Sequence, residues 1–570
     1  MRRLRRLPSG VVVAAIYVVI AFLLTLATWR SPTATYVGEG PDPLQAMWGI
    51  GWVPYAATHG LNPLVSTAMN APTGLNLLWA DAFAIPMGIV LWPVTVTLGA
   101  TFSYNLVITL SLALAAFVAF LVIRRWVPGT VAAALGGLLY GFSPYTTAQY
   151  FGHISLVMSA VAPPLALMLV DEIVVRQSRR PLVLGILTGA LAVLQFFISQ
   201  EVLLTVTIAA AVVIIVLAVS YRDQVRAHAP FVLRTLGIAA VIAVVVLAYP
   251  TWLQFFGPDH AVITGAVHGT DTYVTDAANF VVPTVVQLLS PQGAINISKH
   301  FTGNASEWDA YLGIPLVLLF VVATVRFWGA PVIRTGGIVA AIFAVFSLGP
   351  QLHIAGHQLS AIVLPWWIPA HLPVLENILP ARLMMYVFLA AAITFAFLLR
   401  LLFLIRSSVA LNALVAIVVL FPLLPRLPGP STTAPTQEPF TSPTSARAFQ
   451  GATVLFEPLP GVDYPQAMVW QRTAAYTFTM LGGYIIGPYS PGVEALQQRI
   501  HALAASGTTV TLSENDRADI LRQVLDLHVG DVVVGSGASA GTASFFTSLF
   551  AAPPASSDGF LIWKVGADHG

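Results

Sequence analysis

A carboxylate between two prolines occurs near the start of the chain, where Asp42 lies in the segment GEGPDP. The prolines restrict the backbone on both sides of this residue. A carboxylate held in this way can accept the proton of a hydroxyl group. Asp42 is also suited to begin a helix as its N-cap, because Pro43 and Gln45 follow at the first and third helical positions and complete a capping box. The two roles are compatible, since capping would orient the carboxylate.

Two further acidic residues lie in the same polar stretch. Glu39 precedes Asp42 by three residues, and it is either a second catalytic carboxylate or a solvated loop charge. Asp81, in LLWADAF, comes just before an apolar segment. It is either an alternative proton acceptor or a residue that begins a helix. Asp42, Glu39 and Asp81 are therefore the candidate catalytic residues, with Asp42 as the first choice.

Arg382 is the residue best suited to bind a phosphate. It lies in ENILPARLMMY at the start of an apolar segment, and its planar guanidinium group can donate two parallel hydrogen bonds to phosphate oxygens. The alternatives are a membrane anchor whose charged end reaches the interface, or an ion pair with Glu376. Lys299 and His300 form a second basic pair that could bind an anionic group.

Two carboxylates complete the candidate substrate-binding residues. Glu201, in FFISQEVLL, lies between two apolar segments, where an unpaired charge is costly, so it needs a partner or a water-filled cleft. Glu307 lies with Asp309 at the approach to another apolar segment. The histidines lack the spacing of a metal site, and the chain has no cysteine. We expect no structural metal and no cofactor, and a divalent-cation site of carboxylates stays open.

The elements that position these residues must be membrane helices. Charged residues make up 9% of the 570 residues, against about 25% in a typical soluble domain. Hydrophobic residues reach 57%, and the mean hydropathy is +0.82. These values exclude disordered, collagen-like and coiled-coil proteins. A net charge of +2 gives no reason to expect nucleic acid as a partner. The hydropathy makes the lipid bilayer the expected partner of the chain.

The sequence predicts an α-helical polytopic protein with about eleven transmembrane helices. The predicted segments are 11–29, 103–123, 130–147, 153–172, 182–199, 202–220, 231–249, 309–327, 333–349, 383–403 and 409–424. A further apolar segment, 85–100, is short and contains two prolines. If it does not cross, the arginine clusters gather on one side, which the positive-inside rule places in the cytoplasm. Segments 44–57 and 85–100 are then expected to be in-plane helices on the outer face.

This orientation predicts a multi-pass protein of the plasma (inner) membrane with a cytoplasmic N-terminus. Three long outer loops, 30–84, 250–308 and 350–381, carry eight of the thirteen acidic residues in segment 1–425. Long loops in a compact protein are usually functional. The chemistry of the ionisable residues is therefore expected at the extracytoplasmic face.

Three parts of the chain follow from the composition. Residues 1–425 form the membrane domain, 426–444 a Pro/Thr/Ser-rich linker, and 445–570 a small extracytoplasmic α/β domain. In this last part ATVLFEPL, DVVVG and GFLIWKV are predicted strands. Residues 491–505 and 516–525 are predicted amphipathic helices.

This layout resembles the GT-C superfamily, the polytopic glycosyltransferases that use polyprenyl-phosphate sugar donors. The features that resemble it are a first span with a long acidic outer loop (GEGPDP), two in-plane helices, a span ending in the arginine pair of FLVIRRWVPG, a short span ending in FSPY, and a C-terminal outer domain. The resemblance covers residues 1–425 and is one of architecture. Well-known members have adjacent acidic residues where this chain has Glu39 and Asp42. The resemblance implies that Asp42 is the base of an inverting transfer to a glycan, lipid or protein acceptor.

Three functions are weighed against the residues. A glycosyltransferase needs a base for the acceptor hydroxyl and a cation near the departing phosphate, which Asp42 and Arg382 supply, with Lys299 in reserve. An ion-coupled transporter would place ionisable residues near the bilayer midplane, where the predicted segments have none, although a lipid flippase is less affected by this. A non-catalytic envelope-assembly protein leaves the acidic outer loops without a role. The glycosyltransferase is the favoured interpretation.

Overall fold

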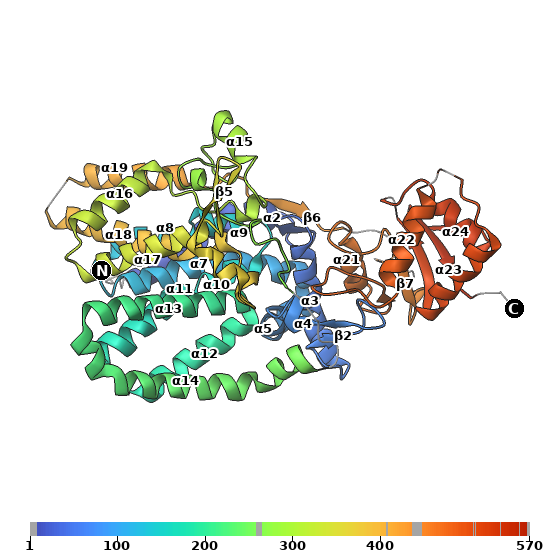
Figure 1. The fold of residues 1–570 in the computed structure, drawn as a ribbon, viewed down its shortest axis with the longest axis horizontal. Coiled ribbons are helices and arrows are strands. Elements are labelled where there is room, and N and C mark those ends of the chain that lie inside the picture. Colours follow the sequence, from blue (N-terminus) through green and yellow to red (C-terminus); the bar gives the residue numbers. More distant parts are fainter. Residues whose placement is uncertain are drawn as a thin grey trace, which may run out of the picture. The chain divides into compact units, whose positions relative to one another are not determined.

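The computed structural model describes residues 8–257, 265–405, 408–435, 440, 447–505, 507, 509–535, 537–557 and 559–566 (Figure 1). Contacts between residues divide the chain into two compact units. The first unit combines Met1–Pro32, Asn105–Ala248 and Ile263–Thr432, and the second combines Thr33–Tyr104, Tyr249–Val262 and Thr433–Gly570. The predicted division had placed residues 33–104 in the membrane domain. In the structure they group with the C-terminal segment instead.

The first unit is helical. Its helices, including α7 and α14 for most of their length, are α1 (Ser9–Leu24), α2 (Leu26–Trp29), α7 (Ala100–Ile123), α8 (Thr130–Gly141), α9 (Pro144–Gln149), α10 (Ile154–Ser159), α11 (Ala162–Val170), η1 (Asp171–Arg176), α12 (Pro181–Ile198), α13 (Gln200–Ser220), α14 (Arg222–Phe256), η2 (Ala277–Phe280), α15 (Gln292–Ser298), η3 (Ala305–Glu307), α16 (Gly313–Arg326), α17 (Pro331–Ser347), η4 (Pro365–Trp367), η5 (Pro369–His371), η6 (Leu375–Asn377), η7 (Pro380–Leu383), α18 (Met384–Leu404), α19 (Val409–Leu420) and η8 (Phe421–Leu423). A hairpin of β4 (Gln351–Ile354) and β5 (His357–Val363) and the strand β6 (Ser431–Thr433) complete the list.

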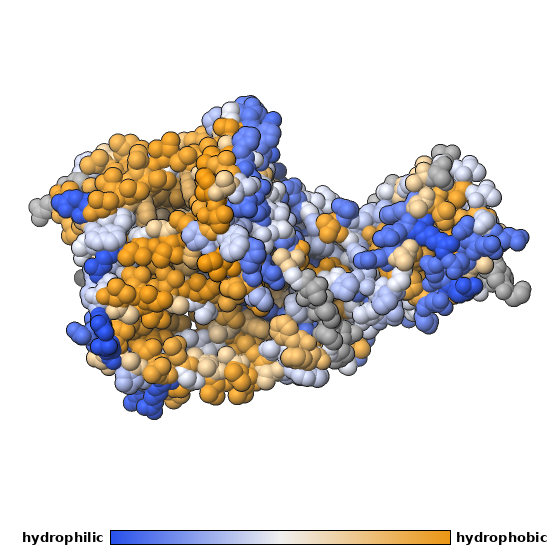
Figure 2. All heavy atoms as spheres, viewed as in Figure 1, coloured by the Kyte–Doolittle hydropathy of each residue, from blue (hydrophilic) through white to orange (hydrophobic). Residues whose placement is uncertain are grey.

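Six of the described helical segments are long and apolar enough to cross a membrane: Ala100–Ile123, Ile154–Arg176, Pro181–Ile198, Gln200–Ser220, Arg222–Phe256 and Pro380–Leu404. Four shorter apolar helices are Ser9–Leu24, Gly313–Arg326, Pro331–Ser347 and Val409–Leu423. Each of the eleven predicted segments contains a helix, and the number that cross stays a prediction. Apolar side chains cover the outer surface of these helices (Figure 2), as expected of helices that contact lipid. The chain is a membrane protein.

Two predicted boundaries were wrong. Segment 85–100 is not one helix, because α5 (Ala84–Val90) and α6 (Trp92–Leu98) are separated at Leu91, just before Pro93. Seven residues of helix extend about 10 Å, far less than the hydrocarbon core of a bilayer. The loop predicted to begin at Pro250 begins later, because α14 continues through this proline to Phe256.

Glycine allows the buried helix α8 to pack closely against α18. A Cβ atom at Gly136 would lie 2.9 Å from the carbonyl oxygen of Ala392 and 3.0 Å from the Cβ atom of Ala396. Small residues of this kind let helix backbones approach each other within a membrane, where packing rather than hydrophobic burial drives association. The middle of α18, a helix that begins directly after the polar cluster described below, is thus held in a tightly packed bundle.

The second unit combines short elements of the first predicted loop with a mixed sheet. It contains β1 (Thr35–Val37), α3 (Asp42–Thr58), β2 (Val65–Ser66), β3 (Leu75–Asn76), α4 (Leu77–Ala80), α5, α6, β7 (Thr453–Glu457), α21 (Gln466–Thr473), β8 (Thr479–Met480), α22 (Val493–Ala504), α23 (Glu514–Asp526), β9 (Val529–Val534), α24 (Thr542–Phe550), β10 (Ala555–Ser557) and β11 (Phe560–Lys564). The five-stranded sheet has the order β10-β11-β9-β7-β8, with β7 parallel to β8 and β9. Strands β7, β9 and β11 and helices α22 and α23 lie where the sequence predicts them. Residues 436–439 and 441–446 of the predicted linker lie outside the described residues.

A buried glutamine joins α3 to the C-terminal part of the second unit. The indole Nε1 of Trp48 donates to Oε1 of Gln471 at 2.8 Å, and Nε2 of Gln471 donates to the carbonyl oxygens of Phe478, at 2.9 Å, and Ala68. Gln471 is fully buried. The hydroxyl of Tyr476 also donates to the carbonyl oxygen of Trp48, at 2.8 Å. These bonds explain why the first loop groups with residues more than four hundred positions away.

We expect Gln471→Leu to lower the free energy of unfolding by about 2 to 3 kcal/mol, because one buried N–H and two carbonyl groups lose their partner. Thermal unfolding of the full-length protein in detergent measures the loss. Gln498→Leu, at an exposed position of α22, is the matched control and should leave the melting temperature unchanged. Equal melting temperatures for the two variants would contradict a supporting role for Gln471.

Candidate active site

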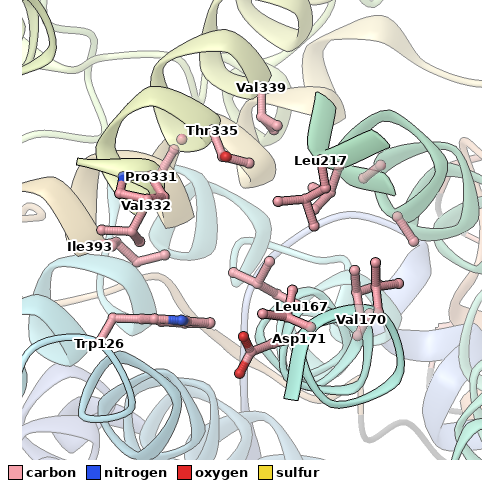
Figure 3. Close-up of a pocket in the computed structure, with 18 of the residues that line it drawn as sticks. Trp126, Leu167, Val170, Asp171, Leu217, Pro331, Val332, Thr335, Val339 and Ile393 are labelled. Atoms are coloured by element: carbon pink, nitrogen blue, oxygen red, sulfur yellow. The ribbon is translucent and has the colours of Figure 1, made fainter. Parts of the chain in front are cut away.

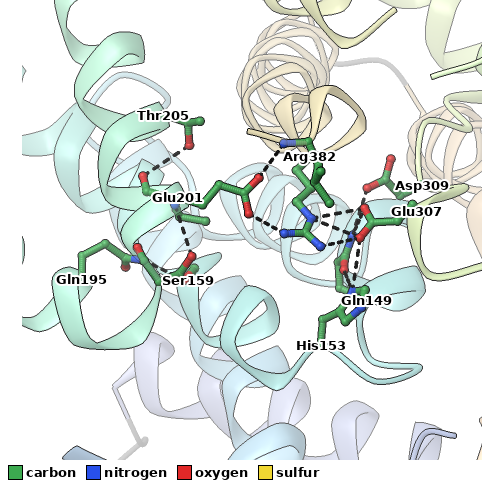
Figure 4. A network of polar contacts seen from close by, with 12 residues as sticks. Gln149, His153, Ser159, Gln195, Glu201, Thr205, Glu307, Asp309 and Arg382 are labelled. Carbon is green, nitrogen blue, oxygen red and sulfur yellow. Dashed lines mark hydrogen bonds and ion pairs between the residues drawn. The ribbon is translucent and has the colours of Figure 1, made fainter. Parts of the chain in front are cut away.

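The first unit holds a buried polar cluster around Arg382, which lies in η7 just before α18 (Figure 4). Its Nε donates to Glu307 Oε1 at 3.1 Å, and its Nη2 donates to the same oxygen at 2.6 Å. Nη1 donates to Oε2 of Glu201, near the start of α13, and the other oxygen of Glu201 accepts from the backbone N–H of Leu379 at 3.0 Å. The guanidinium group therefore lies between two carboxylates that come from distant parts of the chain.

A second layer of polar groups contacts Glu307 from α9 and its neighbourhood. Gln149 Nε2 donates to Glu307 Oε2 at 3.3 Å and to Asp309 Oδ2 at 3.2 Å. With its Nδ1 protonated, His153 donates to Gln149 Oε1 at 2.6 Å and lies 3.5 Å from Glu307 Oε1. Burial favours the neutral form of Glu307, but Arg382 and His153 outweigh it, and the pKa of Glu307 lies below its ordinary value. Glu307 is thus a charged, buried partner of Arg382.

The ion pairs of Arg382 are with Glu201 and Glu307 rather than with Glu376, which was one of the alternatives considered for it. Nothing in the sequence ranks acidic residues by their distance in the fold, and the two that Arg382 contacts lie 181 and 75 positions away from it. Glu201 has the partner that its position required. Gln149 and His153 were missed, because neither forms a recognisable motif in FSPYTTAQY and the residues that follow. Lys299 and His300, at and just after the end of α15, are exposed.

Asp42 lies in the second unit, in the first turn of α3, where a negative charge interacts favourably with the helix dipole. The predicted capping box was wrong, because Pro41 and not Asp42 is the N-cap of α3, and the side chain of Pro41 makes no capping hydrogen bond. The hydroxyl of Tyr484 donates to Oδ1 of Asp42 at 3.1 Å, and Nε2 of Gln45 donates to the carbonyl oxygen of Tyr484 at 2.7 Å. Residues of the C-terminal segment therefore hold the half-buried Asp42 carboxylate and the first turn of its helix.

Asp81 is buried between α4 and α5, with 5% of its surface exposed. It is the C-cap of α4 rather than the start of a helix, so that prediction was also wrong. Its Oδ2 has no hydrogen-bond partner among the described residues. A Cβ atom at Gly49 of α3 would collide with this oxygen, so the glycine is needed for the close approach. Burial raises the pKa of Asp81 well above its ordinary value, and the negative charge of Asp42 raises it further.

The three predicted catalytic residues therefore differ in their surroundings. Asp42 is half-buried, Asp81 is buried and favours its protonated form, and Glu39 is exposed in the loop before α3. Tyr484 was missed as a partner of Asp42, because the sequence offers no signal that links positions 442 residues apart. Among the described residues, no group of three or more histidine, aspartate or glutamate side chains is arranged to hold a metal ion.

Comparison with solved structures shows that the fold is similar to that of an archaeal oligosaccharyltransferase. The oligosaccharyltransferase of Archaeoglobus fulgidus in its apo form aligns over 92% of this chain and 69% of its own length, with a TM-score of 0.51 and 14% sequence identity. The same enzyme in complex with Zn and sulfate aligns over 92% and 68%, with a TM-score of 0.51 and 13% identity. The chain itself belongs to the family described as Domain of unknown function (DUF6311), whose model matches residues 12–424. Comparison with curated proteins finds no match.

Proposed function

We propose that this protein is a membrane glycosyltransferase that transfers a sugar from a polyprenyl-phosphate donor to a hydroxyl acceptor at the extracytoplasmic face. The observation that carries the proposal is the place of Asp42 in a fold similar to that of an oligosaccharyltransferase. Its carboxylate lies at the start of α3, accepts a hydrogen bond from Tyr484, and is close enough to the buried Asp81 for its charge to raise the pKa of that residue. The protein would bind two substrates, the lipid-linked donor and a glycan, lipid or protein whose hydroxyl group accepts the sugar.

Asp42 is proposed as the general base. It accepts the proton of the acceptor hydroxyl as the hydroxyl oxygen bonds to the anomeric carbon of the sugar. The bond from that carbon to the phosphate oxygen breaks, and the phosphate leaves with the electron pair, which inverts the anomeric configuration. Asp81 is a weaker candidate because its raised pKa favours a carboxyl group that already carries a proton. Glu39 is exposed in the loop before α3 and is the other candidate for this role.

Arg382 is proposed to bind the donor phosphate. A guanidinium group has five N–H donors, and bonds to Glu201 and Glu307 leave one hydrogen on each terminal nitrogen for a further acceptor. The two carboxylates fix its orientation in advance, which lowers the entropic cost of binding. Lys299 and His300 are proposed as further anion contacts because they are exposed.

The proposed orientation places the N-terminus in the cytoplasm and the C-terminal residues outside the plasma (inner) membrane. We expect Ser178→Cys to be protected from an impermeant thiol reagent in intact cells, and Ser556→Cys to be labelled. Both positions are exposed, and the native chain has no cysteine, so labelling reports accessibility alone. Permeabilised cells, in which both variants should react, are the control. Labelling of Ser178→Cys in intact cells would refute the orientation.

The proposed reaction is tested with the purified full-length protein in vesicles that contain polyprenyl-phosphate-linked sugars. Release of polyprenyl phosphate together with a sugar bonded to an added acceptor is the expected result. A lipid flippase would instead move the intact donor across the bilayer without breaking its sugar–phosphate bond, so translocation without release of polyprenyl phosphate would overturn the proposal. An assembly protein without catalytic activity would give neither product.

A further inference from the structure

A cavity of about 450 Å³ lies among helices α11, α13, α17 and α18 of the first unit (Figure 3). Figure 3 shows Leu167, Leu217 and Val339 from three of these helices pointing into the same space. Most of the lining residues are aliphatic. The volume of the cavity is within the range of small-molecule sites, and its aliphatic lining is suited to a hydrocarbon ligand.

The cavity is elongated along α13. Both Val206 and Tyr221 line it, and fifteen residues of helix extend about 22 Å. Tyr386 lines the end where Val206 lies, and its hydroxyl is already bonded to Thr205 at 2.8 Å. A long, narrow and apolar space of this kind matches an extended hydrocarbon chain better than a compact ligand.

Most of the polar lining residues lie toward the opposite end of the cavity from Tyr386. Asp171, Arg176, Tyr221 and Gln224 lie there at or next to helix ends, and Trp126 lies in the turn after α7. This distribution of lining residues is complementary to a lipid, which has an apolar chain and one polar end. The polar end lies away from Arg382, since Tyr386 follows Arg382 by one helical turn and marks the other end of the cavity.

The charge at this polar end favours an anionic headgroup. Asp171 accepts from Arg125 Nη2 at 3.0 Å and lies 2.6 Å from Arg176 Nε, and Glu172 also pairs with Arg125. A third arginine, Arg334, donates from Nη2 to the hydroxyl of Tyr221 at 3.1 Å. Its Nε is buried and has no hydrogen-bond partner among the residues that the structure describes. Three arginines face two carboxylates, so one positive charge is left without a countercharge within this group.

We infer that this cavity binds an anionic phospholipid of the bilayer, with one acyl chain between α11, α13 and α17 and its phosphate near Arg176 and Arg334. The site is independent of the proposed transfer reaction, because its polar end lies at the end of the helices opposite to Arg382. A lipid held there would fill a space that otherwise separates helices of the membrane unit. This gives the protein a dependence on the composition of its membrane.

The test uses the full-length protein in phosphatidylcholine vesicles that contain a small fraction of phosphatidylglycerol with a photoactivatable acyl chain. Crosslinked peptides are identified by mass spectrometry. The expected result is labelling within α11, α13 or α17. Gly336→Leu places a side chain in the cavity, where a Cβ atom would meet only Ala390 at 3.8 Å, and should reduce labelling about tenfold by steric exclusion. Gly237→Leu, where a Cβ atom meets nothing within 4 Å, is the matched control and should label normally.

The headgroup is tested with a phosphatidylcholine probe that carries the same chain. Phosphatidylglycerol should label more strongly, and Arg334→Gln should remove the difference while Arg326→Gln retains it. Equal labelling by both probes in the native protein would overturn the anionic assignment, and unchanged labelling of Gly336→Leu would overturn the cavity. Displacement of the probe by polyprenyl phosphate, but not by excess phosphatidylglycerol, would assign the site to the donor lipid and also refute the inference.

Discussion

Asp42→Asn is expected to reduce sugar transfer at least about a hundredfold while the protein folds normally. The substitution keeps the size of the side chain and an oxygen that can accept from Tyr484, but it removes the group that takes up the proton. Pro41 is the N-cap of α3 and its side chain makes no capping bond, and asparagine is itself a good capping residue, so we do not expect loss of a cap to change the activity. Transfer of labelled sugar and the melting temperature are measured on the same purified sample.

Two neighbouring acidic residues provide the controls for this experiment. Glu39→Gln removes an exposed charge three residues earlier and should transfer sugar at nearly the native rate. Asp81→Asn replaces a carboxyl whose raised pKa favours the protonated form, so it should cost much less activity than Asp42→Asn. If Asp42→Asn retains turnover and Asp81→Asn loses it, the base has been assigned to the wrong residue.

Arg382→Met is expected to destabilise the protein by about 3 to 5 kcal/mol, because the buried carboxylate of Glu307 and the half-buried carboxylate of Glu201 lose the cation between them. Glu307 is 3% exposed and has its pKa lowered by Arg382 and His153 against the effect of burial, so its charge depends on that partner. Unfolding of the full-length protein in detergent, by heat or by denaturant, measures the difference in stability from the native protein. A native melting temperature for Arg382→Met would contradict the structural role of the cluster.

Arg382→Lys separates support of the fold from binding of the phosphate. Lysine restores the positive charge and should recover most of the stability, but it lacks the planar fork that can bind Glu307 and a phosphate at the same time. We expect a stable variant with reduced transfer and a raised KM for the lipid donor. Full activity with an unchanged KM would mean that Arg382 serves the fold alone. Arg326→Lys, on α16, is the control for exchanging these side chains elsewhere in the membrane unit.

Apolar length was the most informative property of the sequence. Each predicted apolar segment contains a helix, because a bilayer requires long stretches without charge, and the strands and helices of the tail follow simple alternation and amphipathic periodicity. Segment 85–100 was misjudged because mean hydropathy does not register where a helix is interrupted. The structure separates α5 from α6 just before Pro93.

The candidate site was harder to predict than the helices. Composition and the positive-inside rule selected Arg382, Glu201 and Glu307, but their contact depends on how helices pack, which the sequence does not encode locally. The same limit applies to Asp42, whose partner Tyr484 lies 442 positions away. Residue preferences at helix starts favoured Asp42 as the N-cap, but α3 begins one residue earlier than predicted, with Pro41 as its N-cap. The carboxylate of Asp42 accepts a hydrogen bond from Tyr484 instead. Tertiary contacts, not local preferences, decide the surroundings of each carboxylate.

The hydrogen bond from Trp48 to Gln471 has a consequence for biosynthesis. Its two residues are 423 positions apart, so at about 5 to 20 residues per second the ribosome makes the second of them roughly 20 to 85 seconds after the first. During that interval the face of α3 that later packs on α21 has no native partner, although the helices between them can already enter the bilayer. The second unit can therefore be completed only after Gln471 has been made and α21 has packed on α3.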